Sequence, residues 1–438
     1  MSIATQNQGP HPDVRPGDRR TALGLLMAAY MLSVTDRMIL SVLFDPIKAE
    51  FSLTNTQLGL LGGLTFSLFY ATLGVPLAKY ADRNDRRRLI AACLILFSAM
   101  TAMSGLASGF LMLIIFRILV GVGEAGVNPA SQSMIADYYP SHQRSLAMSV
   151  LTAGGNLGMI FGFLAGGLVS QAYGWRAAFF VVGIPGVLLG LALLLFLKEP
   201  RRGGAEALAS DAKPSRANIG DSVRTMFASP VLRQLLAAST LSGMVTYGIL
   251  QWLPAYFGRV HDLEQGRVGV VMAVFIGVIG AVGTLAGGRL TDVLTKRRVD
   301  LGVRMIALTQ IVMIPLFAVG YMSGSLAVSL AFLALPFFML SFFLGPSLAL
   351  IQTYAPVEMR SLAAAIKMLC LNLVGLSLGP LIVGVITDLL EPSQGTKALA
   401  IALSCIALFS VWSAIHFLLA GRAMLKQERQ AGTAAQRA

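Results

Sequence analysis

The sequence predicts an all-α integral membrane protein with twelve transmembrane helices in two pseudo-symmetric six-helix bundles. Composition is the first reason: of 438 residues, 55% are hydrophobic and 13% are charged, whereas about 25% of the residues of a soluble domain are charged. The second reason is a succession of long apolar runs, and the third is a set of matching segments in the two halves of the chain. Lipid is therefore the predicted solvent of most of the chain.

Each apolar run is long enough to cross a bilayer core of about 30 Å. The expected bounds are 21–45, 56–78, 88–107, 110–136, 144–170, 175–197, 230–257, 265–290, 301–322, 325–350, 358–388 and 395–420. The first twenty residues lack the apolar stretch and the cleavage site of a signal peptide, so the first run is expected to insert as an anchor. We expect one six-helix bundle over 21–197 and a second over 230–420. Three cytoplasmic segments, an amino-terminal tail over 1–20, a linker over 198–229 and a carboxyl-terminal tail over 421–438, complete the chain.

Positive charge gathers in alternate connections between the runs. Lys and Arg cluster in the amino-terminal tail and in the second, sixth and eighth connections, and the intervening connections have few. The positive-inside rule then places both termini in the cytoplasm and requires an even number of spans. This distribution accounts for the net charge of +13 without a nucleic-acid partner. The predicted location is the cell inner (plasma) membrane as a multi-pass monomer, whose partners are the lipid bilayer and a small solute.

Matching segments indicate that the two halves are duplicates. An Arg-Ser-Leu-Ala run at 144–147 recurs at 360–363, 216 residues later, and the same offset relates Asn156 to Asn372. Matches at one offset between apolar segments point to an internal repeat. Because each half holds six spans, the repeats have parallel topology.

A charged pattern, Gly-x-x-x-Asp-Arg-x-Gly-Arg-Arg, is partly met in the second connection of each half. The matching residues are Asp82, Arg83, Arg86 and Arg87 in the first half, with Ala78 and Asp85 in place of the glycines, and Gly288, Asp292, Lys296 and Arg297 in the second. A second pattern, Arg-x-x-x-Gly-x-Gly-x-Ala, is met at 117–125. With twelve spans and a duplication, these patterns resemble the major facilitator superfamily over essentially the whole chain. The resemblance implies alternating access around a cavity lined by the first, fourth, seventh and tenth spans.

A narrower resemblance is carried by Thr35-Asp36-Arg37 and by the stretch from Arg117 to Glu124-Ala125. These residues are similar to the Spinster branch, whose lipid-exporting members move sphingosine-1-phosphate or lysophospholipids. The resemblance implies a proton-sensitive secondary transporter of an amphipathic, anionic solute of that kind. Polar organic anions such as aromatic acids, taken up with protons, are the alternative substrates.

Four charges lie at membrane depth, namely Asp36, Arg37, Arg117 and Glu124. A charge at the bilayer centre costs at least about 2.5–3.5 kcal/mol, so it normally faces a cavity or a partner. We expect one proton-coupling cluster lining the cavity, with Asp36 as the main proton switch and Glu124 as the alternative. The charges sum to zero, so protonating either carboxylate leaves a positive charge that suits an anionic substrate. A charge network that only holds the helices together is the competing interpretation.

Further polar or aromatic side chains in the spans are candidates for the wall of the substrate cavity. They are Asn128, Asn156, Tyr247, Gln251, Trp252, Lys367 and Asn372. Lys367 is slightly more readily explained as a side chain that extends to the membrane surface. Asn156 and Asn372 can alternatively form hydrogen bonds between helices.

The charged connections predict a conformational latch at the cytoplasmic side. Its expected members are Asp82, Arg83, Arg86, Arg87, Asp137, Arg144, Asp292, Lys296, Arg297 and Arg360. We expect Asp82 to reach the start of the eleventh span near Arg360, because a helix amino terminus carries partial positive charge. One of the neighbouring arginines is expected to pair with Asp137, and Asp292 to reach the fifth span near Arg144.

No motif of an enzyme is found. The sequence has no Walker loop, nucleophile elbow or His/Cys cluster with metal-ligand spacing, and Cys93, Cys370 and Cys405 all lie in apolar runs. We therefore expect no enzymatic activity, no metal site and no cofactor, with protons as the coupling ion. A channel is also disfavoured, since no selectivity-filter sequence is present.

Overall fold

The computed structural model describes residues 16–200, 219–356 and 359–437, and within these ranges the chain forms helices and turns without a strand. Ten helical stretches are long and apolar enough to cross a bilayer. The last of the ten contains two passes, because a turn at Gly395 divides it. The helix α10 (Pro230–His261) is not among the ten, but it is 32 residues long and adds another pass. The described chain therefore makes twelve passes, and the predicted all-helical membrane fold is confirmed.

The first half contains six passes. They are α1 (Pro16–Val42), α3 with α4 (Asn55–Gly62 and Leu64–Ala81), α5 (Arg86–Ser104), α6 (Phe110–Tyr138), α7 (Ser141–Tyr173) and α8 (Trp175–Phe196). The short helix α2 (Phe44–Phe51) connects α1 to α3. Most expected bounds lie within a few residues of those observed.

The second half repeats this arrangement after the short helix α9 (Ile219–Ala228). Its passes are α10, the run α11–η1–α12 (Gln265–Met272, Ala273–Ile279, Gly280–Arg297), α13 (Leu301–Met322), α14 with α15 (Leu326–Leu340 and Leu344–Tyr354), the run α16–η3–α17 (Arg360–Cys370, Leu371–Leu376, Ser377–Gln394) and α18 (Ala398–Arg437). The 3-10 turn η4 (Gly395–Lys397) precedes α18.

The largest difference from the expected bounds is at the end of α18, and smaller ones are found at the start of α1 and at the ends of α12 and α17. Helix α1 begins at Pro16, before the predicted start at 21, and α18 continues to Arg437 through most of the predicted tail. Proline suits the first turn of a helix because its missing N–H has no helical partner there. The tail is rich in Ala, Gln, Glu, Lys and Arg, which have high helix propensity.

Several passes are interrupted along their length. α3 and α4 meet at Gly63, α14 and α15 meet at a turn over 341–343, and π-helical segments interrupt the passes at η1 and η3. Such segments leave backbone groups outside the regular helical pattern and occur often at functional sites.

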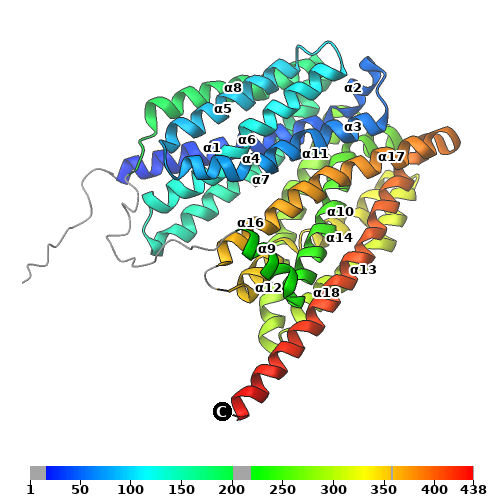
Figure 1. Ribbon diagram of the computed structural model, residues 1–438. Coiled ribbons are helices and arrows are strands. Elements are labelled where there is room, and N and C mark those ends of the chain that lie inside the picture. Colours follow the sequence, from blue (N-terminus) through cyan, green and yellow to red (C-terminus); the bar gives the residue numbers. More distant parts are fainter. Residues whose placement is uncertain (1–15, 201–218, 357–358, 438) are drawn as a thin grey trace, which may run out of the picture.

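The two halves meet at one end and diverge at the other, as Figure 1 shows. Between the halves, α3 packs against α17 and α7 packs against α11, at the end that also carries α2. We call this the closed end. The opposite end carries the beginning of α1 and the end of α18, and we call it the open end.

Glycines allow close backbone contact at the closed end. A Cβ atom on Gly59 would lie 2.5 Å from the carbonyl oxygen of Pro380, and one on Gly63 would lie 2.8 Å from that of Ser377. Both pairs join α3 or the turn after it to the last segment of the α16–η3–α17 run. Side chains larger than hydrogen would separate the two halves at this end.

Candidate functional site

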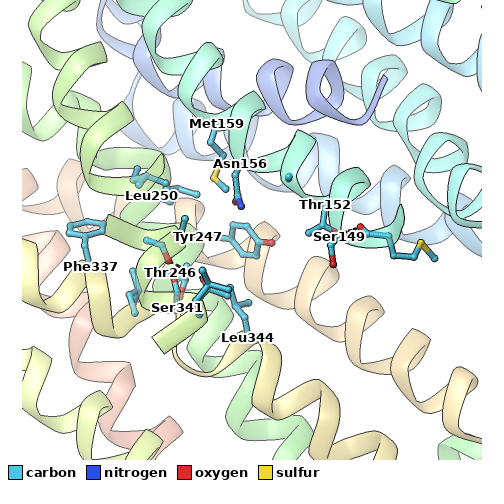
Figure 2. Close-up of a pocket in the computed structure, with 18 of the residues that line it drawn as sticks. Ser149, Thr152, Asn156, Met159, Thr246, Tyr247, Leu250, Phe337, Ser341 and Leu344 are labelled. Atoms are coloured by element: carbon cyan, nitrogen blue, oxygen red, sulfur yellow. Dashed lines mark hydrogen bonds between the residues drawn. The ribbon is translucent and has the colours of Figure 1, made fainter. Parts of the chain in front are cut away.

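A cavity of about 720 Å³ lies between the halves. Figure 2 shows Ser149, Thr152 and Asn156 on α7 facing the region of Thr246 and Tyr247 on α10. The remaining lining residues come from α7, α10, η1, α12 and the α14–α15 junction, namely Ser145, Met148, Ala153, Met159, Leu250, Ile276, Gly280, Ala281, Thr284, Leu285, Phe337, Leu340, Ser341 and Leu344. A cavity of this size suits a small organic molecule.

Apolar and uncharged polar side chains, most of the latter bearing hydroxyl groups, form the wall of this cavity. None of the described residues that line it is charged. The residues that line this cavity belong to the fifth, seventh, eighth and tenth passes, and none of them belongs to the first or fourth, which the sequence predicts as part of the wall. The reason is close packing of α1 behind α7: Cβ atoms on Gly154 and Gly162 would lie 2.7 Å and 2.8 Å from the carbonyl oxygens of Met27 and Thr35.

The four charges at membrane depth form two ion pairs between α1 and α6. Arg117 Nη1 donates to Asp36 Oδ2 at 2.7 Å, and Arg37 Nε donates to Glu124 Oε2 at 2.7 Å. The hydroxyl of Thr101 on α5 also donates to Asp36 Oδ1. Adjacent residues on α1 thus reach different partners two turns apart on α6, because they point about 100° apart on a helix.

The cluster is buried within the first half and does not line the cavity as predicted. Asp36 and Glu124 are each 1% exposed, and the side chain of Arg37 is 20% exposed. The Arg37 guanidinium lies 4.5 Å from the ring centre of Tyr70, and Tyr70 and the cavity-lining Tyr247 pack against the same apolar core. Arg37 is therefore the most exposed member of the cluster.

The two carboxylates differ in how their oxygens are engaged. Both oxygens of Asp36 accept hydrogen bonds, from Thr101 and Arg117. Glu124 accepts from Ser33 and Arg37 through Oε2 alone, and its buried Oε1 has no hydrogen-bond partner in the described part of the chain. The sequence predicts Asp36 as the main proton switch, whereas the geometry favours Glu124, because an unengaged oxygen can take a proton without losing a donor.

The other cavity candidates separate into two groups. Asn156 and Tyr247 line the cavity. Gln251 and Trp252 are buried toward the closed end, where Trp252 Nε1 donates to the carbonyl oxygen of Pro380 at 2.8 Å. Asn128 accepts a hydrogen bond from Gln132 on the same helix and is not among the lining residues.

Lys367 is buried rather than extended to the membrane surface. The residue is 1% exposed, and Nζ donates to the carbonyl oxygen of Leu344 at 3.2 Å. Leu344 lines the cavity at the α14–α15 junction, so Lys367 lies directly behind the cavity wall. The preferred snorkelling interpretation is wrong, because the break between α14 and α15 provides an acceptor inside the bundle. Asn372 lies in η3, outside the cavity lining.

The predicted latch residues lie at the open end, where the halves are apart. Arg86 donates to Asp137 at 2.5 Å and to Glu199 at 2.7 Å, so one of the predicted arginines contacts Asp137. Asp82 and Arg360 are exposed, and neither side chain has an ion-pair partner within the described ranges.

The remaining latch residues also lie at the open end. Arg144 donates to the carbonyl oxygen of Ala136 in its own half. Asp292, Lys296 and Arg297 are exposed, as is Arg83 in the first half. The latch therefore stays a prediction about the other conformation, in which the open end is closed.

Sequence reasoning missed the hydroxyl groups of the cavity wall. Thr152, Thr246, Thr284 and Ser341 line the cavity, and each lies within an apolar run. Hydroxyl groups are common inside membrane helices because they can bond to a backbone carbonyl of the preceding turn. Thr152, Thr246 and Thr284 make this bond, so the sequence offers little to distinguish them from structural hydroxyls.

Known proteins of the same architecture identify the family. The model of the Major Facilitator Superfamily matches residues 26–380. An MFS-type efflux pump of Mycolicibacterium smegmatis is 31% identical over 414 residues, 94% of each chain. A probable L-galactonate transporter of Escherichia coli is 27% identical over 285 residues, 63% of this chain and 62% of that protein. A crystal structure of a bacterial homologue of the human lysosomal transporter Spinster, inward-facing and unoccupied, is similar with a TM-score of 0.87 and 26% identity, covering 94% of this chain and 99% of that one.

These relatives are membrane transporters and not enzymes. The family match covers most of the chain, and the likeness to the Spinster homologue extends over both halves. The chain belongs to the Major Facilitator Superfamily, as its charged motifs and twelve passes predict.

Proposed function

We propose that the protein is a proton-coupled secondary transporter of an amphipathic anionic solute, resembling sphingosine-1-phosphate or a lysolipid. The observation that carries the proposal is the cavity between the halves, which is lined by apolar and hydroxyl-bearing side chains and by no charged residue among those described. A wholly polar anion would lose its hydration in such a cavity without gaining an ionic partner, which is costly. A solute with an apolar body avoids this cost.

The route into the cavity supports the same class of solute. Helix α7 packs against α11 and η1 near the closed end, and α12 is not among its principal neighbours. Leu285 of α12 and Met148 of α7 both line the cavity, and Leu285 is mostly exposed. An apolar opening between these helices would let a lipid-like molecule enter from the bilayer.

Two cations near the cavity support an anionic head group. Arg37 is the most exposed member of the cluster, and α1, which carries it, packs against α10, which carries the cavity-lining Tyr247. Lys367 lies behind Leu344 and has no carboxylate partner in the described chain. With both carboxylates of the cluster ionised, the buried charges of the four-residue cluster cancel and Lys367 adds one positive charge. Guanidinium and ammonium groups bind phosphate and carboxylate well once desolvated.

Coupling follows from competition for Arg37. When Glu124 is ionised it holds Arg37, while Asp36 and Arg117 satisfy one another. A proton on Glu124 would release Arg37 to bind the head group near Tyr247. Proton and anion then favour each other's binding, and by linkage each strengthens the other by the same factor. Inward-facing access would correspond to the open end if the termini are cytoplasmic, as the positive-inside rule predicts.

A second candidate is transport of polar organic anions. The Escherichia coli relative is described as a probable L-galactonate transporter, and the buried positive charge would suit such a substrate as well. The hydroxyl groups of Thr152, Thr246 and Ser341 in the cavity wall could bind the hydroxyls of a sugar acid. The two candidates differ in whether an apolar chain is required for binding.

Counterflow in proteoliposomes distinguishes these candidates. Labelled lysophosphatidic acid, sphingosine-1-phosphate and L-galactonate would each be tested for exchange against an internal unlabelled pool. We expect exchange of the two amphiphiles and little exchange of L-galactonate. Exchange of L-galactonate alone would overturn the assignment of substrate class, whereas flux without exchange would indicate a channel.

The matched control is a variant that fills the cavity and leaves the charge cluster intact. Thr284→Trp places a bulky ring in the wall opposite α7, far in sequence from Asp36 and Glu124. The variant should bind neither class of solute while keeping its thermal unfolding midpoint. Unchanged exchange in this variant would show that the solute does not pass through this cavity.

A further inference from the structure

The closed end separates the cavity from the side of the molecule opposite the termini. It is sealed by contacts of α3 with α17 and of α7 with α11. These contacts must break if the cavity is to open on that side. The residues that join α3 to α17 therefore contribute to the stability of this conformation.

Asp388 near the end of α17 binds the amino terminus of α3. Its Oδ1 accepts from the backbone N–H of Asn55 at 2.8 Å, and its Oδ2 accepts from that of Thr56 at 2.7 Å. The side-chain amide of Asn55 donates to the same Oδ1 at 2.7 Å. Asn55 is the first residue of α3, so a carboxylate of the second half occupies two of the free N–H groups of this helix.

Asn55 is completely buried and collects partners from both halves. Its Nδ2 donates to Glu391 at 2.8 Å, and its Oδ1 accepts from Arg259 at 2.8 Å and from Lys48 at 3.0 Å. Asp388 and Glu391 are three residues apart and lie on one face of α17. Both hydrogen-bonding atoms of the buried amide are thus satisfied, and most of its partners belong to the opposite half.

The arrangement stabilises the closed end for two physical reasons. The first turn of a helix has unpaired N–H groups and a partial positive charge, both of which favour a carboxylate. The local cap of α3, Thr54, accepts from Gln57 N and leaves the first two N–H groups to Asp388. Gly384, one turn before Asp388, allows the approach, because a Cβ atom there would contact the carbonyl oxygen of Asn55.

We propose that Asp388 is the gate residue of the closed end and that it forms a reciprocal pair with Asp82. Asp82 follows the last turn of the second pass, α3–α4, and Asp388 lies near the end of the eleventh, α16–η3–α17. Asp388 caps the amino terminus of the second pass at the closed end. Asp82 is placed to cap the amino terminus of the eleventh pass at the open end. Asp388 makes its contact here, while Asp82 is exposed.

Only one of the two caps can form at a time, because the halves touch at one end when they separate at the other. The second and eleventh passes would then act as a two-state element whose equilibrium both aspartates set. This inference depends on the alternating-access fold and not on the proposed substrate. It can therefore fail while the substrate assignment holds, and the substrate assignment can fail while this inference holds.

The test is the distance between spin labels at Tyr173 and Lys397, exposed residues of the first and second half at the closed end. The background would have Cys93, Cys370 and Cys405 replaced by alanine. Asp388→Asn replaces one acceptor oxygen with a donor facing a backbone N–H. We expect the ratio of separated to closed molecules to rise about fivefold, in line with the loss of a helix cap.

Glu50→Gln is the matched control. Glu50 is also a carboxylate at the closed end, and it accepts from Arg176 at 2.5 Å and from Trp175 at 2.7 Å. All three residues belong to the first half, so the variant removes comparable hydrogen bonds without affecting contact between the halves. Its distance distribution should match that of the parent.

Gly384→Ala gives a second test that does not alter charge. The added methyl group should force α17 away from Asn55 and populate the same separated state. It keeps the proposal testable if Asp388→Asn does not fold, as judged by thermal unfolding. A parental distribution in folded Asp388→Asn, or an equal shift in Glu50→Gln, would overturn the proposal.

Discussion

Replacing Glu124 by glutamine should abolish the pH dependence of anion binding. Glu124 holds Arg37 through contacts of 2.7 Å to Nε and Nη2. Glutamine keeps the shape of the side chain but carries no charge, so the four-residue cluster changes from neutral to a net charge of +1. Arg37 then has no ionised partner at position 124 at any pH, as we propose for the parent only when Glu124 is protonated.

The size of the effect follows from the bond that Glu124 no longer makes. A hydrogen bond to a charged group contributes about 1.5–3 kcal/mol, which corresponds to a factor of about 10 to 150 in a binding constant. Arg37 is partly exposed, with 20% of its side-chain surface accessible, so the lower end applies. At about pH 8, where an ordinary carboxylate is ionised, Glu124→Gln should bind an anionic amphiphile about tenfold more tightly than the parent does.

The assay is the dissociation constant of lysophosphatidic acid, measured by calorimetry between about pH 5 and 8, a range that covers raised carboxylate pKa values. The parent should bind more tightly as the pH falls, because proton binding releases Arg37, and Glu124→Gln should bind equally at all pH values. A neutral lysolipid serves as the control probe and should show no pH dependence in either protein.

Asp36→Asn decides which carboxylate is the switch. Asp36 is held through both oxygens, by Thr101 and Arg117, so its replacement should weaken the fold and leave the pH dependence in place. If Asp36→Asn loses the pH dependence and Glu124→Gln keeps it, the assignment from the geometry is refuted and Asp36 is the switch, as the sequence predicts.

Two further predictions concern residues outside the first-half cluster. Asp82→Asn should leave this conformation intact, since Asp82 is exposed here, and should increase its population by weakening the other state. Labels at the exposed residues Gln143 and Arg297, at the open end, would report this change, and an unchanged distribution would argue against the latch. Lys367→Gln should weaken the binding of an anionic amphiphile by up to about tenfold and leave the binding of a neutral amphiphile unchanged. Thermal-shift titrations would measure both. Equal loss for both amphiphiles would make Lys367 a structural residue that only holds Leu344.

The sequence predicts the fold well because lipid imposes strong rules on it. Apolar length determines the passes, and the distribution of Arg and Lys predicts their orientation, which stays a prediction. The repeat at 144–147 and 360–363 is visible without a structure. The ends were less predictable: α18 continues to Arg437 because the tail consists mostly of residues with high helix propensity and contains no proline.

The candidate site was predictable in part. Intramembrane charge identifies Asp36, Arg37, Arg117 and Glu124, because a charge at that depth requires a partner. Their pairing and burial were not predictable, since they depend on how closely α1 packs on α7 and how α6 turns toward α1. The role of Asn55 could not be inferred either, because an asparagine after threonine at a helix start also fits an ordinary cap.

Photolabelling tests most directly the central claim that an amphipathic solute occupies the cavity between the halves. A lysophosphatidic acid analogue with a photoreactive group in its chain would be irradiated with the protein, and the labelled peptides identified by mass spectrometry. The account predicts labels on the cavity faces of α7 and α10, around Asn156 and Tyr247, that are displaced by unlabelled lysophosphatidic acid and lost in Thr284→Trp. Labels confined to lipid-facing residues such as Leu188 and Leu195 of α8, unaffected by competitor, would contradict it.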